Sequence, residues 1–211
     1  MARYTGPVCR LCRTEQKKLF LKGTRCKSDK CALNKKRFYP GKDPKARIGK
    51  KSDYSLQLRE KQKIKRMYNM LEKQFHLYFE RALRMSGVTG ENLVAMLESR
   101  LDNVVYRMRF ASSRAQARQI VNHGHVLVNG KRVNIPSYGV KPRDVVEIQE
   151  KSKKMLPILD ALSEVSKSGV VPWIEIDIDA QKGTYLAHPK AGEVADLADI
   201  KEQLVVELYS K

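Results

Sequence analysis

Apolar side chains recur at nearly helical spacing between residues 52 and 108. Ser52-Asp53 offers a helix start, and Ser86-Gly87 ends the first periodic stretch. The apolar positions of this stretch, all expected in the core, are Leu56, Ile64, Met67, Leu71, Phe75, Tyr78 and Ala82. A second helical stretch after Thr89-Gly90 carries Leu93, Leu97, Leu101, Val104, Val105 and Met108. The pattern predicts one or two amphipathic helices followed by a further helix.

A compact unit with clear turn signals follows. Ser113 and Gln116 form an S-x-x-Q capping box at the start of a short helix that Gly124 ends. Asn129-Gly130 is the strongest two-residue hairpin signal. The strands expected around it are 126–128, 132–135 and 144–148. We therefore expect two helices packed on a small sheet.

The last part of the chain mixes helix and strand patterns. Residues 158–168 follow a helical pattern, and residues 173–178 alternate as a half-buried strand. Residues 184–186 are the expected hairpin partner, across a turn at Lys182-Gly183. The closing apolar segment 204–208 is expected to pack back onto an earlier domain.

Charge is spread very unevenly along the 211 residues, which carry a formal net charge of +19. Residues 1–70 contain 22 Lys and Arg against 5 Asp and Glu, a net of +17, whereas residues 155–211 carry −5. Residues 1–51 are rich in Gly, Pro and basic side chains and have little core of their own, so we expect a metal ion and a partner to order them. Such a basic segment repels itself unless a partner neutralises it.

A polyanionic partner follows from this charge, and nucleic acid fits better than a membrane. Residues 1–51 lack the broad apolar face that a membrane-surface helix needs. No apolar leader follows Met1, and no stretch approaches the ~20 apolar residues of a membrane span. We expect an intracellular protein. The alternatives are a merely soluble basic protein or a disordered tail.

Four cysteines lie within the first 31 residues, with the spacing C-x2-C-x13-C-x4-C. In a reducing compartment, two close pairs favour metal over disulfide. Four thiolates complete a tetrahedral zinc site and leave no position for a substrate, so we expect one structural Zn²⁺. The expected ligands are Cys9, Cys12, Cys26 and Cys31. Free reduced thiols, or a redox-sensitive set, are the alternative.

A second group of basic residues suits phosphate. Arg114 and Arg118 are four residues apart and therefore share one helix face. Guanidinium groups bind phosphate through two parallel hydrogen bonds, and we predict that RNA is the ligand. The predicted RNA-binding residues are Arg107, Arg109, Arg114, Arg118, Lys131 and Arg132, together with Lys50, Lys51, Arg59, Lys63 and Arg66. The alternative is an ordinary solvated helix face.

Nothing in the sequence indicates catalysis. His123 and His125 have no carboxylate or nucleophile nearby in sequence. The acidic residues Glu175, Asp177 and Asp179 alternate, which places them on the solvent face of a strand rather than around a metal. Phosphate-binding glycine loops and nucleophile motifs are missing from the sequence.

The chain resembles the family of the fourth protein of the bacterial small ribosomal subunit. The segments that carry the resemblance are 97–107, 113–119 and 125–130, the start at 1–4, the segments 52–54 and 58–62, and the ending 206–211. It covers nearly the whole chain. The four cysteines match the branch of the family that carries N-terminal zinc ligands, and the phosphate-facing positions of the central module fall on Arg107, Arg114, Arg118 and Lys131. Related chains often carry a small residue at the position of Arg109.

The resemblance implies a primary binder of 16S ribosomal RNA, contacting a multi-helix junction of the 5′ domain early in assembly. It also implies a place near the mRNA entry channel, with mRNA close by, contact with the fifth protein of the subunit, and an influence on decoding accuracy. The expected location is the ribosome, in the cytoplasm.

The resemblance leaves one rival class. The same module occurs on pseudouridine synthases, and Arg100-Leu101-Asp102 echoes their motif. We expect Asp102 to lie mid-helix and no catalytic domain to follow, so the predicted protein is not an enzyme. The predicted fold class is α+β: a zinc-knuckle extension over 1–51, a helical domain over 52–97 completed by about 185–211, and a helix-hairpin RNA-binding module with a short β-sheet over 98–184.

Overall fold

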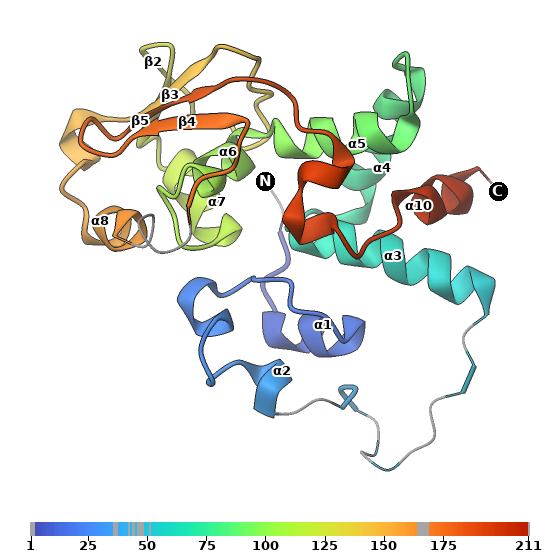
Figure 1. Ribbon diagram of the computed structural model, residues 1–211. Coiled ribbons are helices and arrows are strands. Elements are labelled where there is room, and N and C mark those ends of the chain that lie inside the picture. The colour runs from blue at the N-terminus through green and yellow to red at the C-terminus, as the bar shows by residue number, and fades with distance from the viewer. Residues whose placement is uncertain are drawn as a thin grey trace. The chain divides into compact units, whose positions relative to one another are not determined.

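The computed structural model describes residues 3–35, 38–41, 43, 45, 49–50, 52–163 and 169–210 (Figure 1). The chain forms two compact units, one of residues 1–94 with 190–211 and one of residues 95–189. The sequence placed the corresponding boundaries near residues 97/98 and 184/185. No helix in the described ranges is long and apolar enough to cross a membrane.

The first unit is helical. Its helices are α1 (Val8–Glu15), α2 (Ala32–Lys35), α3 (Asp53–Met67), α4 (Glu72–Arg84), α5 (Thr89–Glu98), which runs into the second unit, and α10 (Glu202–Tyr209), with short 3-10 turns at Gly23–Cys26, Ala191–Glu193 and Ala195–Leu197. Ser52 caps α3 as predicted, its hydroxyl accepting a hydrogen bond from the N–H of Ser55 at 3.3 Å. The closing segment forms α10, which packs along α3 (Figure 1).

The core positions predicted between residues 52 and 87 are confirmed in the centre of the stretch and wrong at two positions. Ile64, Phe75 and Ala82 are fully buried. Leu56 and Leu71, predicted as core, are 41% and 38% exposed. Leu71 is exposed because the stretch is two helices, broken after Met67, and Leu71 is the residue that caps the second.

Helix α1 was not predicted, because Gly6-Pro7 and the surrounding charges suggest irregular structure. It packs on α3, and Leu19 beyond its end is fully buried. The side chain of Glu15 attaches α1 to α3. Its carboxylate, which is completely buried, pairs with Arg59 at 3.2 Å and with Arg66. Burial raises the pKa of Glu15, and these two cations oppose that shift. The extension therefore has a core contact of its own.

The second unit holds one antiparallel sheet of five strands in the order β2-β1-β3-β5-β4 (Figure 1). The strands are β1 (Val126–Val128), β2 (Lys131–Arg132), β3 (Val145–Ile148), β4 (Ile174–Asp177) and β5 (Lys182–Tyr185). The unit's helices are α6 (Leu101–Arg107), α7 (Arg114–Asn122) and α8 (Leu156–Leu162), with a 3-10 turn at Glu150–Ser152. A methyl group on Gly183 would lie 2.9 Å from Met108, so the end of α6 packs directly on β5.

The turn signal at Asn129-Gly130 correctly located the hairpin of β1 and β2. Asn129 and Gly130 have φ of +49° and +74°, the left-handed pair of the predicted hairpin turn. The Asn129 side chain also donates to Asp144 at 2.8 Å and accepts from the N–H of Val145 at 2.9 Å, which fixes the turn to β3. Ser113 caps α7 as predicted, but Gln116 accepts from the N–H of Ser112 and not from that of Ser113.

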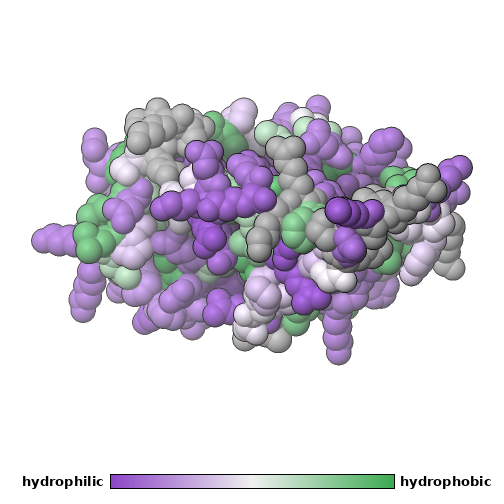
Figure 2. Space-filling model, turned by 90° about the horizontal axis from the view of Figure 1, so that it is seen from below, coloured by the Kyte–Doolittle hydropathy of each residue, from purple (hydrophilic) through white to green (hydrophobic). Residues whose placement is uncertain are grey.

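Two predicted boundaries are wrong, and a third falls on residues outside those described. Strand β2 ends at Arg132, not at residue 135. Lys182 and Gly183 were predicted as a turn, but they lie inside β5 and pair with Asp177 and Ile176. Helix α8 ends at Leu162, and the rest of the predicted helix, at 164–168, lies outside the described residues. The face seen in Figure 2 is mostly hydrophilic, with apolar side chains in separate small areas.

Candidate nucleic-acid interface

The predicted site residues belong to a buried charge network in the second unit, to exposed or half-buried cations, and to the cysteines of the first unit; Lys51 lies outside the described residues. The network begins where the predicted long helix breaks. Ser99 and Arg100 separate α5 from α6, and the first N–H groups of α6 donate to loop carbonyls, Leu101 to Tyr138 at 2.8 Å and Asp102 to Pro136 at 3.1 Å. These bonds satisfy donors that a helix start otherwise leaves unpaired.

Glu98 is the centre of this network and is fully buried. It accepts two parallel hydrogen bonds from Arg107, at 2.9 Å and 2.7 Å, and one from Asn103 at 2.8 Å. Asn103 in turn accepts from Arg114 on α7 at 2.8 Å. A single carboxylate thus ties together the end of α5, both ends of α6 and the start of α7.

Asp102 holds a second part of the network. Arg100 donates to its two oxygens at 3.0 Å and 2.7 Å, and Arg118 lies 3.6 Å from one of them. Asp102 was expected mid-helix, but it lies in the first turn of α6, where a carboxylate also interacts favourably with the helix dipole.

The burial of these arginines was not expected. Arg107, Arg114 and Arg118 are 9%, 5% and 1% exposed. Arg114 also lies over the Tyr106 ring, 4.6 Å from its centroid. The sequence showed that Arg114 and Arg118 share a helix face, but that face packs on α6 instead of facing solvent. Their contact with RNA stays a prediction, and their role in positioning α6 and α7 comes first.

Other predicted RNA-binding residues are more accessible. Lys50 and Lys131 are exposed, and Lys131 sits at the tip of the hairpin. Arg132 is exposed but donates to the carbonyls of Gly124 at 3.0 Å and His123 at 3.1 Å, where it caps the end of α7. Arg109 is half-buried, with φ of +61°, a conformation that favours Gly or Asn.

The basic face of α3 is partly engaged within the protein. Arg59 and Arg66 bind Glu15, and Lys63 pairs with Glu60 at 2.5 Å. All three side chains are half-buried, and Arg59 and Arg66 orient the N-terminal extension. Lys51 lies outside the described residues. Sequence reasoning missed Glu15, although it is the single acidic residue before Asp29 in a strongly basic segment.

The four cysteines lie around α1 and the turn that follows it. Cys9 and Cys12 are on α1, Cys26 ends the 3-10 turn, and Cys31 precedes α2. Cys26 accepts a hydrogen bond from the N–H of Lys22 at 3.3 Å. Burial, with smaller contributions from the other three thiols, raises the pKa of the Cys12 thiol to about 11, so all four are electrostatic neighbours. Among the described residues, however, no three metal-binding side chains are grouped so that they could hold an ion.

Comparison with known proteins decides the family. Residues 3–98 match the ribosomal protein S4/S9 N-terminal domain, and residues 99–146 match the S4 domain. The small ribosomal subunit protein uS4 of Syntrophotalea carbinolica is 56% identical over 211 residues, the whole of both chains. The protein of the same name from Thermotoga maritima is 53% identical over the same length. The chain belongs to the uS4 family. The match confirms the predicted family.

The charge network yields a prediction about stability. Replacing Glu98 with Gln keeps the shape but leaves the buried Arg107 without its counter-charge, so we expect a loss of about 3–5 kcal/mol in the free energy of unfolding. Urea unfolding, followed by hydrogen exchange of the α6 and α7 amides, measures it. Glu175→Gln, an exposed carboxylate on β4, is the matched control and should cost less than ~0.5 kcal/mol. Equal stability of the two variants would contradict the role of Glu98.

Proposed function

We infer that this protein is a structural, non-catalytic component of the small ribosomal subunit in the cytoplasm, and that it binds ribosomal RNA. The observation that carries this is the full-length match to proteins named small ribosomal subunit protein uS4. The net charge of +19, with +17 in residues 1–70, supports a polyanionic partner. That family is not one of enzymes, which agrees with the predicted absence of catalysis.

The finer part of the proposal concerns which RNA is bound and how. We propose 16S rRNA, at a multi-helix junction of the 5′ domain, beside the fifth protein of the subunit and near the mRNA path, with an influence on decoding accuracy. Lys131 and Lys50 are exposed and suited to direct phosphate contact. The buried network holds α6 and α7 in one arrangement, from which the hairpin with Lys131 continues.

Shape and backbone should dominate recognition, because the deep major groove of duplex RNA hides its base edges. Asp102 does not support the rival assignment, which is a pseudouridine synthase. A catalytic carboxylate must reach its substrate, whereas Asp102 is 5% exposed and engaged by Arg100 and Arg118.

Binding to a 16S rRNA transcript tests the function directly. We expect the full chain to prefer this transcript over its antisense copy of the same length and charge. If six or more phosphates are contacted, affinity should fall about 10³-fold or more between 50 and 200 mM salt. Filter binding over a salt series measures both. Equal affinity for the two transcripts would refute specific rRNA binding.

We further propose that Cys9, Cys12, Cys26 and Cys31 hold one structural zinc ion. The donor set supports this, since four thiolates suit tetrahedral Zn²⁺, and N–H groups such as that of Lys22 already point at the sulfur of Cys26. When bound, the ion would cross-link α1 to the turn and to α2. Forming this site requires the sulfurs to draw together, because they are not grouped as ligands in the structure described.

Metal analysis of purified protein tests the zinc site. We expect about one zinc per chain, lost in Cys26→Ser and kept in Ser28→Ala, a change in the same turn. Thiol titration gives an independent reading, because bound thiolates should react slowly until a chelator is added. Four rapidly reacting thiols in metal-free wild-type protein would argue against zinc.

A further inference from the structure

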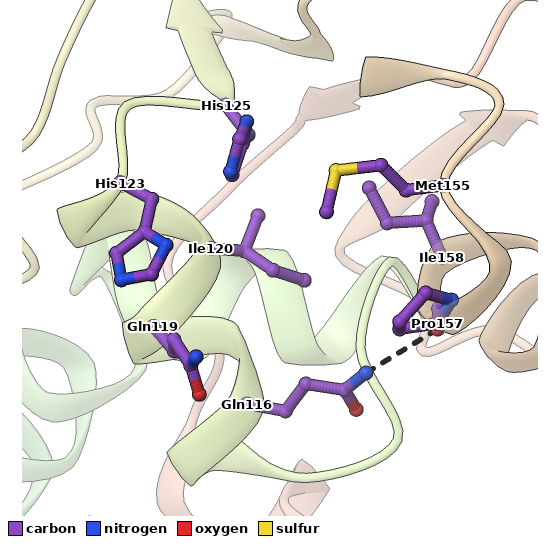
Figure 3. Close-up of a pocket in the computed structure, with 8 residues that line it drawn as sticks. All are labelled: Gln116, Gln119, Ile120, His123, His125, Met155, Pro157 and Ile158. Atoms are coloured by element: carbon purple, nitrogen blue, oxygen red, sulfur yellow. Dashed lines mark hydrogen bonds between the residues drawn. The ribbon is translucent and has the colours of Figure 1, made fainter.

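A small pocket in the second unit lies apart from the charge network. One side of the pocket is formed by α7 and the residues after it. The other side is formed by the segment around the start of α8 (Figure 3). Its volume is about 190 Å³, below the ~300 Å³ at which sites for larger organic ligands begin. The lining residues are Gln116, Gln119, Ile120, His123, His125, Met155, Pro157 and Ile158.

The inner part of the pocket is apolar and held in place. Ile120 faces Met155 and Ile158 across it (Figure 3). Gln116 spans its base: its amide oxygen accepts from Ser112 at 2.8 Å, and its amide nitrogen donates to the carbonyl of Pro157 at 3.3 Å. This bridge ties α7 to α8, so the space between them is preformed.

Flat polar groups lie on the α7 side of the pocket. His123 and His125 lie with ring centroids 5.9 Å apart and their planes inclined at 57°, and Gln119 comes from the same side as His123 (Figure 3). His125 is oriented by a hydrogen bond of 2.8 Å between its Nδ1 and the Ser152 hydroxyl. Burial, together with His123 and Arg132, lowers the pKa of His125, so its ring is neutral at neutral pH. An apolar pocket lined by two imidazole rings and the Gln119 amide suits a planar heterocycle with a hydrogen-bonding edge.

Charge around the mouth favours a ligand attached to phosphate. None of the eight lining residues is acidic. Arg132 binds the carbonyls of His123 and Gly124, which places its guanidinium beside the rim. On the other side, the exposed Lys154 directly precedes Met155. One cation thus lies beside the apolar pocket and a second is next to it in sequence, whereas the apolar side chain of a protein partner would need no cation.

We propose that this pocket receives one unstacked nucleobase of ribosomal RNA, stacked on His123 and contacted at its edge by Gln119. The proposal rests on the inferred rRNA binding and adds a base-reading site to it. Arg132 and Lys154 would neutralise the adjacent phosphates. Stacking of a base on a protein ring tolerates sequence differences, whereas the Gln119 amide adds a preference through hydrogen bonds.

The double variant Gln119→Ala/His123→Ala tests the site in the full chain. Both side chains are exposed, so folding should be unchanged by circular dichroism. We expect affinity for the 16S rRNA transcript to fall about tenfold, the effect of losing one stacked base. Asn122→Ala, an exposed neighbour on α7 outside the pocket, is the control and should bind like the wild type. Wild-type affinity in the double variant would overturn the proposal.

A photo-crosslinking residue at position 119 identifies the occupant in assembled small subunits. We expect crosslinks to one rRNA nucleotide. Wild-type protein should protect the base edge of that nucleotide from chemical modification, and the double variant should not. Crosslinks to a ribosomal protein alone would overturn the proposal in favour of a protein side chain. If the wild-type protein does not bind rRNA, the function inferred above is refuted instead. Failure of the pocket proposal and failure of the inferred function are therefore distinguishable.

Discussion

The buried carboxylate of Glu98 is the constraint on which the second unit depends. Taking a carboxylate out of water costs several kcal/mol, and this cost is offset only when its oxygens are well paired. Arg107 and Asn103 provide that pairing, and Arg114 joins through Asn103. Because these partners come from two helices, the network specifies one packing of α6 against α7. The hairpin follows directly from the end of α7, so its position depends on the same contacts.

This constraint divides the basic residues by role. Arginines predicted from the sequence as phosphate ligands, Arg107 and Arg118 among them, form buried ion pairs that hold the module together. Exposed cations such as Lys131 remain for the polyanion. The first unit repeats the arrangement, since Glu15 anchors the N-terminal extension to α3 through Arg59 and Arg66. In both units a buried carboxylate, Glu98 or Glu15, pairs with arginines and so fixes the segment that carries them.

Local signals in the sequence were sufficient where local chemistry decides the structure. The caps at Ser52 and Ser113 and the turn at Asn129-Gly130 depend on nearby backbone groups, and all three were predicted. The break between α5 and α6 was missed because the apolar period continues across it, while its hydrogen bonds go to residues 136–138. Burial of Arg118 could not be predicted because Asp102, its partner, lies on a different helix. The pocket beside α7 depends on α8, which lies more than thirty residues further along the chain.

The central claim is that buried arginines position the module and exposed cations bind RNA. The most direct test is the salt dependence of binding to 16S rRNA. It is measured for Arg118→Met and Lys131→Ala under conditions where both variants are folded. Each phosphate contact adds about one to the slope of log K against log salt concentration. The account predicts the wild-type slope for Arg118→Met and a slope smaller by about one for Lys131→Ala. A reduced slope for folded Arg118→Met, with Lys131→Ala unchanged, would contradict it.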